Sequence, residues 1–290
     1  MRELQDLARR LLESGEVAVV LGYEEGPRGV RPAFVRRPED AGRLVFDERC
    51  VQNLAAYLSP RRGHVAALGR AAVVVKGCDA RAVAGLLRES QVRREDLVLI
   101  GMRCGGVLAD PSHRAALAAD TVAPRCPGCA AREPQLADHV LGELPAAPPG
   151  AATRDARIAE LDAMSPAGRW QFWQAEFARC VRCYACRQVC PMCFCERCVA
   201  EKSVPQWIES SPHARGNLSW HLTRALHEAG RCADCGECER ACPAQIPLTL
   251  LTRKLALVID RRFDFRVSDD PNVPAPIGTY RLDDAQEFIL

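Results

Sequence analysis

The N-terminal sixty residues carry apolar side chains first in a helical pattern and then in short strand-like runs. A helix is predicted at residues 3–12, because one of its faces carries only apolar side chains: Leu4, Leu7, Ala8, Leu11 and Leu12. Short strands are predicted at residues 16–21, 33–36 and 44–46. A second helical run, residues 51–58, ends before a Ser-Pro pair. The start of the chain therefore predicts a mixture of helices and strands.

Two uninterrupted apolar runs in the next segment enclose a helical run. Residues 71–76 and 97–101 predict fully buried strands, and residues 80–89 predict a helix between them, after a turn at residues 77–79. A strand, a helix and a second strand in this order form a βαβ unit, in which the two strands are parallel. Residues 1–143 are therefore predicted to form an α/β domain with a parallel sheet.

The C-terminal half shows helical periodicity. Residues 166–178 follow a serine and begin with a proline, which is the N-cap and first-turn chemistry of a helix. Further helices are predicted at residues 217–228 and 247–260. The remainder, residues 261–290, is rich in proline and lacks periodicity.

A stretch rich in proline and alanine at residues 144–152 separates the two halves. We therefore expect a linker at residues 144–164, a second domain at residues 165–262 and an extended tail at residues 263–290. A chain of 290 residues is long enough for two such domains, each with its own core.

Composition and charge narrow the functional classes. Hydrophobic residues make up 48% of the chain and charged residues 26%, which is ordinary for a soluble globular protein. The net charge of +2 provides no electrostatic basis for binding nucleic acid or an anionic membrane surface. Residues 1–10 carry charges instead of the apolar run of a signal peptide, and no stretch is apolar enough for a membrane span. We therefore expect a cytoplasmic protein, in which the sixteen cysteines are ligands or buried thiols.

One cysteine spacing occurs twice between residues 179 and 242, a stretch that holds eleven of the sixteen cysteines. Each run has the form C-x2-C-x2-C-x3-C-P, and the runs contain Cys180, Cys183, Cys186 and Cys190, and Cys232, Cys235, Cys238 and Cys242. This is the spacing of bacterial two-cluster ferredoxins, in which the fourth cysteine of each run binds the other cluster. Zinc ribbons and disulfides are the alternatives, but zinc sites usually use paired C-x2-C knuckles.

The ferredoxin spacing predicts two cross-ligated 4Fe-4S clusters. The first would be bound by Cys180, Cys183, Cys186 and Cys242, and the second by Cys232, Cys235, Cys238 and Cys190. Residues 165–262 are accordingly predicted to form an α+β domain of the two-4Fe-4S ferredoxin type with extra helices.

Four further cysteines belong to the predicted α/β domain. Cys78 follows the first strand of the βαβ unit and Cys104 follows the second, so both thiols are expected at the carboxyl edge of the sheet. Cys126 and Cys129 form a C-x2-C knuckle in a turn. Together these thiols suffice for a third 4Fe-4S cluster. Buried structural cysteines and a redox-active dithiol at Cys126 and Cys129 remain as alternatives.

Three cysteines are not needed by the duplicated spacing: Cys193, Cys195 and Cys198. They indicate another metal site, for which Cys50, His213 or an external group is the candidate fourth ligand. Local packing beside the first cluster is an equally good explanation.

The run from Arg179 to Cys198, with its extra Met-Cys-Phe-Cys, resembles the beta subunit of deazaflavin-dependent formate dehydrogenase, within the larger family of deazaflavin-reducing hydrogenase beta subunits. The resemblance extends over residues 45–262. Its other landmarks occur in the order of the family: Lys76 to Ala80, Ile100 to Gly106, Cys126 to Cys129, and Cys232 to Pro243.

The resemblance implies an α/β domain with FAD and a cluster, and a ferredoxin domain that connects this flavin to a catalytic subunit. It therefore supports the third cluster at Cys78, Cys104, Cys126 and Cys129. The chain departs from the family in two places that concern FAD. Its first helix contains no glycine, and the segment after the knuckle is reduced to residues 130–150. We therefore expect no adequate flavin pocket.

These observations predict an iron-sulfur electron-transfer subunit without catalytic residues of its own. It would relay electrons between a dehydrogenase or hydrogenase module and a flavin-containing partner that resembles the heterodisulfide-reductase A subunit. The alternative is a flavoenzyme subunit that itself oxidises or reduces deazaflavin or another hydride carrier. A regulatory iron-sulfur sensor is disfavoured, because the sequence contains no DNA-reading helix or basic patch.

Overall fold

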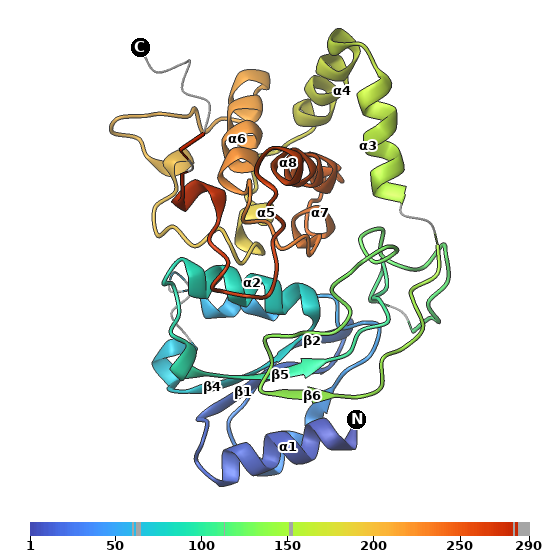
Figure 1. Ribbon diagram of the computed structural model, residues 1–290, viewed down its shortest axis with the longest axis vertical. Helices are drawn as coiled ribbons and strands as arrows, with labels where there is room; N and C mark the ends of the chain where they lie inside the picture. Colours follow the sequence, from blue (N-terminus) through green and yellow to red (C-terminus); the bar gives the residue numbers. More distant parts are fainter. Residues whose placement is uncertain (60, 62–64, 113, 151–152, 281, 284–290) are drawn as a thin grey trace.

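A sheet with a helix on each face builds the N-terminal half of the molecule, and a group of helices lies over one of these faces (Figure 1). The computed structural model describes residues 1–59, 61, 65–112, 114–150, 153–280 and 282–283. Helix α1 (Arg2–Glu13) lies on the outer face of the sheet, and α2 (Gly77–Arg88) lies on the face toward the C-terminal helices. None of the helices in the described ranges combines the length and the apolar character that a membrane span requires.

The sheet is mixed and mostly parallel. Its strands are β1 (Val19–Gly26), β2 (Gly29–Val35), β3 (Leu44–Val45), β4 (Ala71–Val75), β5 (Leu97–Met102) and β6 (His139–Leu141). They lie in the order β2-β1-β4-β5-β6, and β3 also pairs with β1. Strands β1, β4, β5 and β6 are parallel, whereas β2 and β3 are antiparallel to β1. Strand β2 is antiparallel because a short turn between Gly26 and Gly29 joins it directly to β1.

The predicted βαβ unit is confirmed by β4, α2 and β5. Ala71 of β4 pairs with Leu97 of β5 in parallel register. Every residue of both strands is buried, as expected for central parallel strands whose two faces are covered. The predicted apolar face of α1 is also confirmed, because Leu4, Leu7, Ala8 and Leu11 lie in the core beneath the sheet.

Three elements differ from the predicted ones. The second predicted helix forms only a 3-10 helix, Leu54–Leu58, and the Asn53 side chain caps it by accepting a hydrogen bond from the Ala55 N–H (3.0 Å). Helix α2 begins at Gly77, so the predicted turn is its first turn. Strand β6 was not predicted, because three residues that are half-buried or exposed carry no periodic signal.

The C-terminal half is helical in the described residues. Its helices are α3 (Thr153–Ala163), α4 (Pro166–Ala178), α5 (Ala185–Gln188), α6 (Ala214–His227), α7 (Glu237–Arg240) and α8 (Leu248–Phe263). Within the described ranges no strand follows β6, so the predicted α+β character is not seen there. Ser165 caps α4 as predicted, since its Oγ accepts a hydrogen bond from the Gly168 N–H (3.1 Å). Helix α3 lies within the expected linker, and an ion pair between Asp155 and Arg253 (3.0 Å) joins it to α8.

The two cysteine runs share a backbone conformation. Arg182 and Asp234 occupy equivalent positions between the first and second cysteines, and both have positive φ (57° and 59°). Tyr184 and Gly236, which precede α5 and α7, also have positive φ (59° and 70°). Left-handed residues turn the chain sharply, so each run curls around a small volume before its short helix begins. Helices α5 and α7 contact each other.

The two halves of the chain are packed together. Met192 and Ala233 belong to the C-terminal half but lie in the hydrophobic core of the α/β half. An ion pair between Arg231 and Glu89 (2.6 Å) crosses the same boundary. The described part of the tail turns back onto the α/β half, where the Asp269 carboxylate accepts a hydrogen bond from the Gln135 N–H (2.7 Å). This part of the tail is therefore held by its own chain, and residues 281 and 284–290 of the predicted tail lie outside the described residues.

Candidate metal centres

The structure brings together the four cysteines predicted for the first cluster. Cys180, Cys183, Cys186 and Cys242 line one cavity, which we call site 1 and which encloses about 320 Å³ of empty space, counted out to the open solvent. Cys242 comes from the other cysteine run and reaches the cavity because α5 and α7 lie against each other. Apolar side chains, including Trp220 and Ile246, complete the walls.

The predicted second set also shares one cavity. Cys190, Cys232, Cys235 and Cys238 line site 2, which encloses about 370 Å³ of empty space. Most of the polar wall of site 2 comes from α6, its C-cap and α8. This wall includes the buried side chains of Arg224, Glu228 and Thr252. The exchange of fourth cysteines between the two runs is therefore present in the folded chain.

The four cysteines of the α/β half line a third cavity, site 3, with about 430 Å³ of empty space: Cys78, Cys104, Cys126 and Cys129. Cys78 lies in the first turn of α2, which follows β4, and Cys104 lies just beyond the end of β5. Both therefore lie at the carboxyl edge of the sheet, as predicted. Lys76, Arg125 and Arg132 give the cavity a positive lining.

Backbone N–H groups point at several of these sulfur atoms. The Arg182 N–H donates to Cys180 Sγ in site 1 (3.4 Å). In site 3 the Gly106 N–H donates to Cys104 Sγ (3.4 Å) and the Val107 N–H to Cys126 Sγ (3.4 Å). Hydrogen bonds to sulfur stabilise thiolate ligands and raise the reduction potential of an iron-sulfur cluster.

Burial raises the pKa of many of the thiols. It raises the pKa of Cys186 to about 11 and that of Cys238 to about 12. Burial also raises the pKa values of Cys78, Cys232 and Cys235 well above the usual value of a thiol. A buried thiolate needs a cation beside it, so these thiols keep their protons unless a metal is bound. All sixteen cysteines have free thiols.

The spacing of the ligand atoms argues against single zinc ions. A tetrahedral zinc ion with Zn–S bonds of about 2.3 Å brings its thiolates to about 3.8 Å from one another. Among the described residues, the only three potential ligand atoms within 4.8 Å of one another belong to Cys190, Cys193 and Glu228. The four thiols of each of sites 1, 2 and 3 therefore lie farther apart than the ligands of a single ion.

The three sites follow one another through the molecule. Arg224 lines site 2 and donates a hydrogen bond to the Cys186 carbonyl of site 1 (3.4 Å). Asp234 lines both site 2 and site 3. Arg125 lines site 3, and its side chain packs against Gly236, the residue after Cys235 of site 2. A Cβ at Gly236 would lie only 2.7 Å from the Arg125 Cδ. Site 2 is therefore the central one.

The structure separates the three additional cysteines. Cys193 lies beside site 2, where its Sγ donates a hydrogen bond to Glu228 Oε1 (3.0 Å). Cys195 is exposed, and Cys198 packs against the helical core. In the described part of the chain these three thiols do not form a group with single-ion spacing, so a separate site made by them is not observed.

The two candidate fourth ligands have other contacts. Cys50 is buried in the core of the α/β half, its Sγ accepts a hydrogen bond from the Asp47 N–H (3.3 Å), and burial raises its pKa to about 12. His213 caps α6 and pairs through Nε2 with Glu209 (2.8 Å). Neither residue belongs to a group with Cys193, Cys195 and Cys198.

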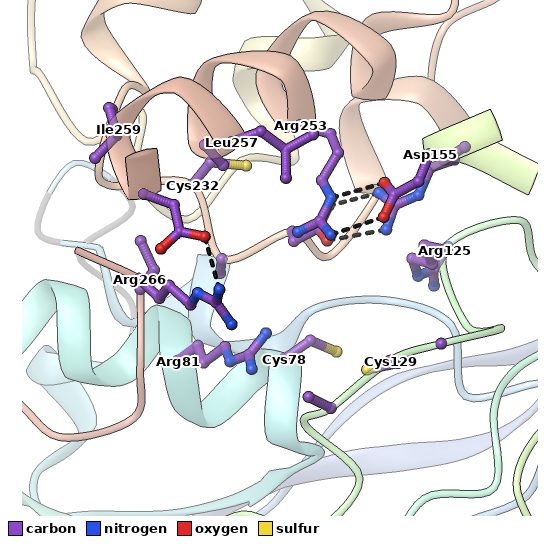
Figure 2. Close-up of a pocket in the computed structure, with 18 of the residues that line it drawn as sticks. Cys78, Arg81, Arg125, Cys129, Asp155, Cys232, Arg253, Leu257, Ile259 and Arg266 are labelled. Carbon is purple, nitrogen blue, oxygen red and sulfur yellow. Dashed lines mark hydrogen bonds and ion pairs between the residues drawn. The ribbon is translucent and has the colours of Figure 1, made fainter. Parts of the chain in front are cut away.

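A large cleft, which we call the central cleft, lies between sites 2 and 3 (Figure 2). Cys232 lines one side and Cys78 and Cys129 the other, and about 1290 Å³ of empty space lies between the walls. Five arginines line it: Arg81, Arg125, Arg154, Arg253 and Arg266. Four of them form ion pairs: Arg125 with Glu237 (3.9 Å), Arg154 with Asp234 (2.5 Å), Arg253 with Asp155 (3.0 Å) and Arg266 with Asp260 (2.8 Å). The sequence analysis did not identify this cleft, because its walls come from five separate segments.

No protein-family model matches the chain. The F420-dependent formate dehydrogenase subunit beta of Methanocaldococcus jannaschii is 35% identical over 103 residues, which are 35% of this chain and 26% of that relative. The match thus spans about a quarter of the relative's length. The F420-dependent formate dehydrogenase 1 subunit beta of Methanococcus maripaludis is 22% identical over 94% of this chain and 92% of that relative. The resemblance to formate dehydrogenase beta subunits is therefore confirmed.

The second alignment also supports the shortening inferred from the sequence. It extends over 365 positions, whereas this chain has 290 residues. The relative therefore carries stretches that have no counterpart here.

Proposed function

We propose that this chain is an electron-transfer subunit that relays single electrons through three 4Fe-4S clusters at sites 1, 2 and 3. The observation that carries this proposal is the presence of three adjoining cavities, each lined by four cysteines. Adjoining sites favour a relay, because electrons pass between neighbouring clusters without any bond being made to a substrate. The similarity to formate dehydrogenase beta subunits supports the same function.

In this relay the chain would supply the ligands of the clusters and the hydrogen bonds and charges around them. The cysteine thiolates would bind the irons, and a bound 4Fe-4S cluster supplies one-electron chemistry. Backbone N–H groups stabilise the sulfur atoms of Cys104, Cys126 and Cys180. The buried guanidinium groups of Arg125 and Arg224 lie between neighbouring sites and would stabilise added electrons. No residue needs to act as a general acid or base.

Site 1 is the proposed contact with one redox partner, because Cys183 is exposed to solvent. We propose that a dehydrogenase or hydrogenase module lies at one end of the relay and a flavoprotein resembling the heterodisulfide-reductase A subunit at the other. A cytoplasmic location is part of the proposal, since sixteen free cysteines suit a reducing compartment. Residues 1–143 and 165–262 would form the two domains.

The central cleft favours a second candidate function, a flavoenzyme subunit. The cleft touches both Cys78 and Cys232, so a flavin there would lie between sites 2 and 3. Its arginines would suit the phosphates of a dinucleotide. However, aspartates already pair with Arg154, Arg253 and Arg266. The first helix also contains no glycine, and the segment after the knuckle is reduced to residues 130–150, so we rank this function second.

The metal and flavin content of the anaerobically purified protein distinguishes between the two candidate functions. We would measure iron, acid-labile sulfide, zinc and released flavin per chain on one sample. About twelve irons without flavin would support the relay with three clusters. About eight irons with one flavin would favour the flavoenzyme, and stoichiometric flavin together with deazaflavin reduction by this chain alone would overturn the relay proposal.

A further inference from the structure

The Glu228 carboxylate lines site 2 and the Cys193 thiol lies beside it, in addition to the four cysteines that a cluster needs. Cys190 and Cys193 both donate hydrogen bonds to Glu228 Oε1, at 3.6 Å and 3.0 Å. The two sulfur atoms and the carboxylate oxygen lie within 4.8 Å of one another. The two thiols are therefore close enough for either to reach the same iron of a cluster at site 2.

The Glu228 carboxylate is buried beside these two thiols. Its side chain is only 2% exposed and lines site 2, and its Oε2 accepts no hydrogen bond from the described residues. A buried carboxylate with a free oxygen is costly unless a ligand or a proton satisfies it. Oε1 thus contacts both thiols, and Oε2 is left to accept a further hydrogen bond.

The two cysteine runs differ in the residues that follow their fourth cysteine. Cys190 is followed by Pro191, Met192 and Cys193, whereas Cys242 is followed by Pro243, Ala244 and Gln245. An equivalent hydrogen bond closes both turns: the Cys193 N–H donates to the Cys190 carbonyl (3.3 Å), and the Gln245 N–H donates to the Cys242 carbonyl (3.0 Å). The backbone differs at the last residue, since Gln245 has positive φ (51°) and Cys193 does not. Cys193 therefore occupies the place of Gln245, and site 1 has no corresponding thiol.

The position of Cys193 is held by its neighbours in the sequence. Met192 is buried (2% exposed) in the core of the α/β half, against Gly85 of α2. Arg231 donates a hydrogen bond to the Met192 carbonyl (3.4 Å), and its guanidinium lies 5.1 Å from the Phe194 ring centroid. Anchored on both sides, the Cys193 thiol stays beside site 2.

We propose that Cys193 is an alternative fourth ligand of the cluster at site 2, exchangeable with Cys190, and that Glu228 accepts a hydrogen bond from whichever thiol is not bound to iron. This inference rests on the proposed function, since it requires a cluster at site 2. In the exchange the iron bond to Cys190 breaks and a bond to Cys193 forms. The Cys193 proton passes through the Glu228 carboxylate to Cys190, and no electron is gained or lost. The central cluster of the relay thus has two ligation states.

The test compares iron content and the EPR spectrum of the reduced protein in four variants of the full chain: Cys190→Ala, Cys193→Ala, the double variant and Cys242→Ala. Each single variant at site 2 is expected to keep the irons of all three clusters, because the other thiol replaces the missing one. The double variant is expected to lose about four irons and one EPR signal. Cys242→Ala is the matched control, which loses about four irons at once because Gln245 cannot replace the thiol.

Two further outcomes distinguish this inference from the proposed function. If Cys190→Ala loses about four irons while Cys193→Ala loses none, the exchange is wrong and the relay stands. If the unmodified protein lacks the iron for a cluster at site 2, both are wrong. Glu228→Gln provides a second readout in folded protein with full iron content. Its EPR spectrum is expected to change at the site 2 cluster alone, and an unchanged spectrum would contradict the role of the carboxylate.

Discussion

At the scale of single residues, buried charges concentrate beside the cysteine cavities. Lys76 is 1% exposed, and its Nζ contacts the Tyr23 hydroxyl (2.5 Å), the Asp79 carboxylate (2.9 Å) and the Gln52 carbonyl (2.9 Å). Arg125 is less enclosed, with a side chain that is 10% exposed, and has Glu237 as its ionic partner at 3.9 Å. Each group is stable only because several partners surround it, so removing one charge leaves another uncompensated.

Replacing Lys76 with methionine is expected to lower the free energy of unfolding by about 3–5 kcal/mol, because it leaves the fully buried Asp79 without its ionic partner. Chemical denaturation under anaerobic conditions measures this change. Tyr23→Phe is the matched control, which removes one hydrogen bond and should cost only about 1 kcal/mol. Equal losses in the two variants would show that the Lys76 charge contributes little.

Replacing Arg125 with glutamine is expected to lower the potential of the cluster at site 3. The positive charge favours the reduced cluster, so its loss should lower the midpoint potential by on the order of 50–100 mV. This is the effect of one unit charge about 7 Å from the cluster at an effective dielectric constant of about 20. EPR-monitored redox titration measures the shift. Arg125→Lys keeps the charge and should shift the potential less, and identical shifts would indicate a purely structural role.

At the scale of elements, the first turn of α2 decides the geometry of site 3. The helix begins at Gly77 and carries Cys78 in its first turn. A Cβ at Gly77 would lie 2.1 Å from the Ala131 carbonyl oxygen, so only glycine permits the loop with Cys129 to approach this closely. The contact joins a helix start to a loop that is distant in sequence, and both carry cysteines of one cavity.

Gly77→Ala is accordingly expected to lower the free energy of unfolding by about 1–3 kcal/mol, because the Ala131 backbone must move. It should also remove the iron of site 3 while sites 1 and 2 keep theirs, which iron analysis and EPR of the purified variant would show. Gly42→Ala is the control, since no atom lies within 4 Å of a Cβ there. A variant with full iron content and normal stability would contradict this account.

At the scale of the whole molecule, the two halves depend differently on their metal sites. The α/β half has a large hydrophobic core around α1 and the central strands. The C-terminal half has smaller hydrophobic cores. Its helices α5 and α7, which each carry a cysteine, are only four residues long. Helices this short are not stable by themselves, so bound clusters should supply much of the order around sites 1 and 2.

Removal of iron is expected to loosen the C-terminal half first. In hydrogen exchange of the anaerobic protein before and after chelation, residues around α5 and α7 should lose protection while β4 and β5 keep theirs. Limited proteolysis provides an independent check, with new cleavage expected after residue 165. Uniform loss of protection in both halves would show that the sheet also depends on the clusters.

The sequence predicted the elements with regular apolar patterns well. Helix α1, strands β4 and β5, and the Ser165 cap of α4 occur where the pattern indicated. Helix α3 and strand β6 were missed, because α3 falls in a stretch that follows several prolines and β6 is too short to show a period. The α+β character expected after residue 165 came from the ferredoxin spacing, and spacing constrains loops without specifying strands.

What the sequence by itself determined is the grouping of the cysteines. Eight cysteines line two cavities in the sets that the ferredoxin spacing indicated. The other four line the third cavity, as indicated by two strand ends, the C-x2-C knuckle and the family resemblance. Only the tertiary structure decided that Glu228 lies beside Cys193, that Arg125 lies between two sites and that a cleft separates sites 2 and 3. These contacts join residues far apart along the chain, where no period or spacing connects them, and folding alone brings them together.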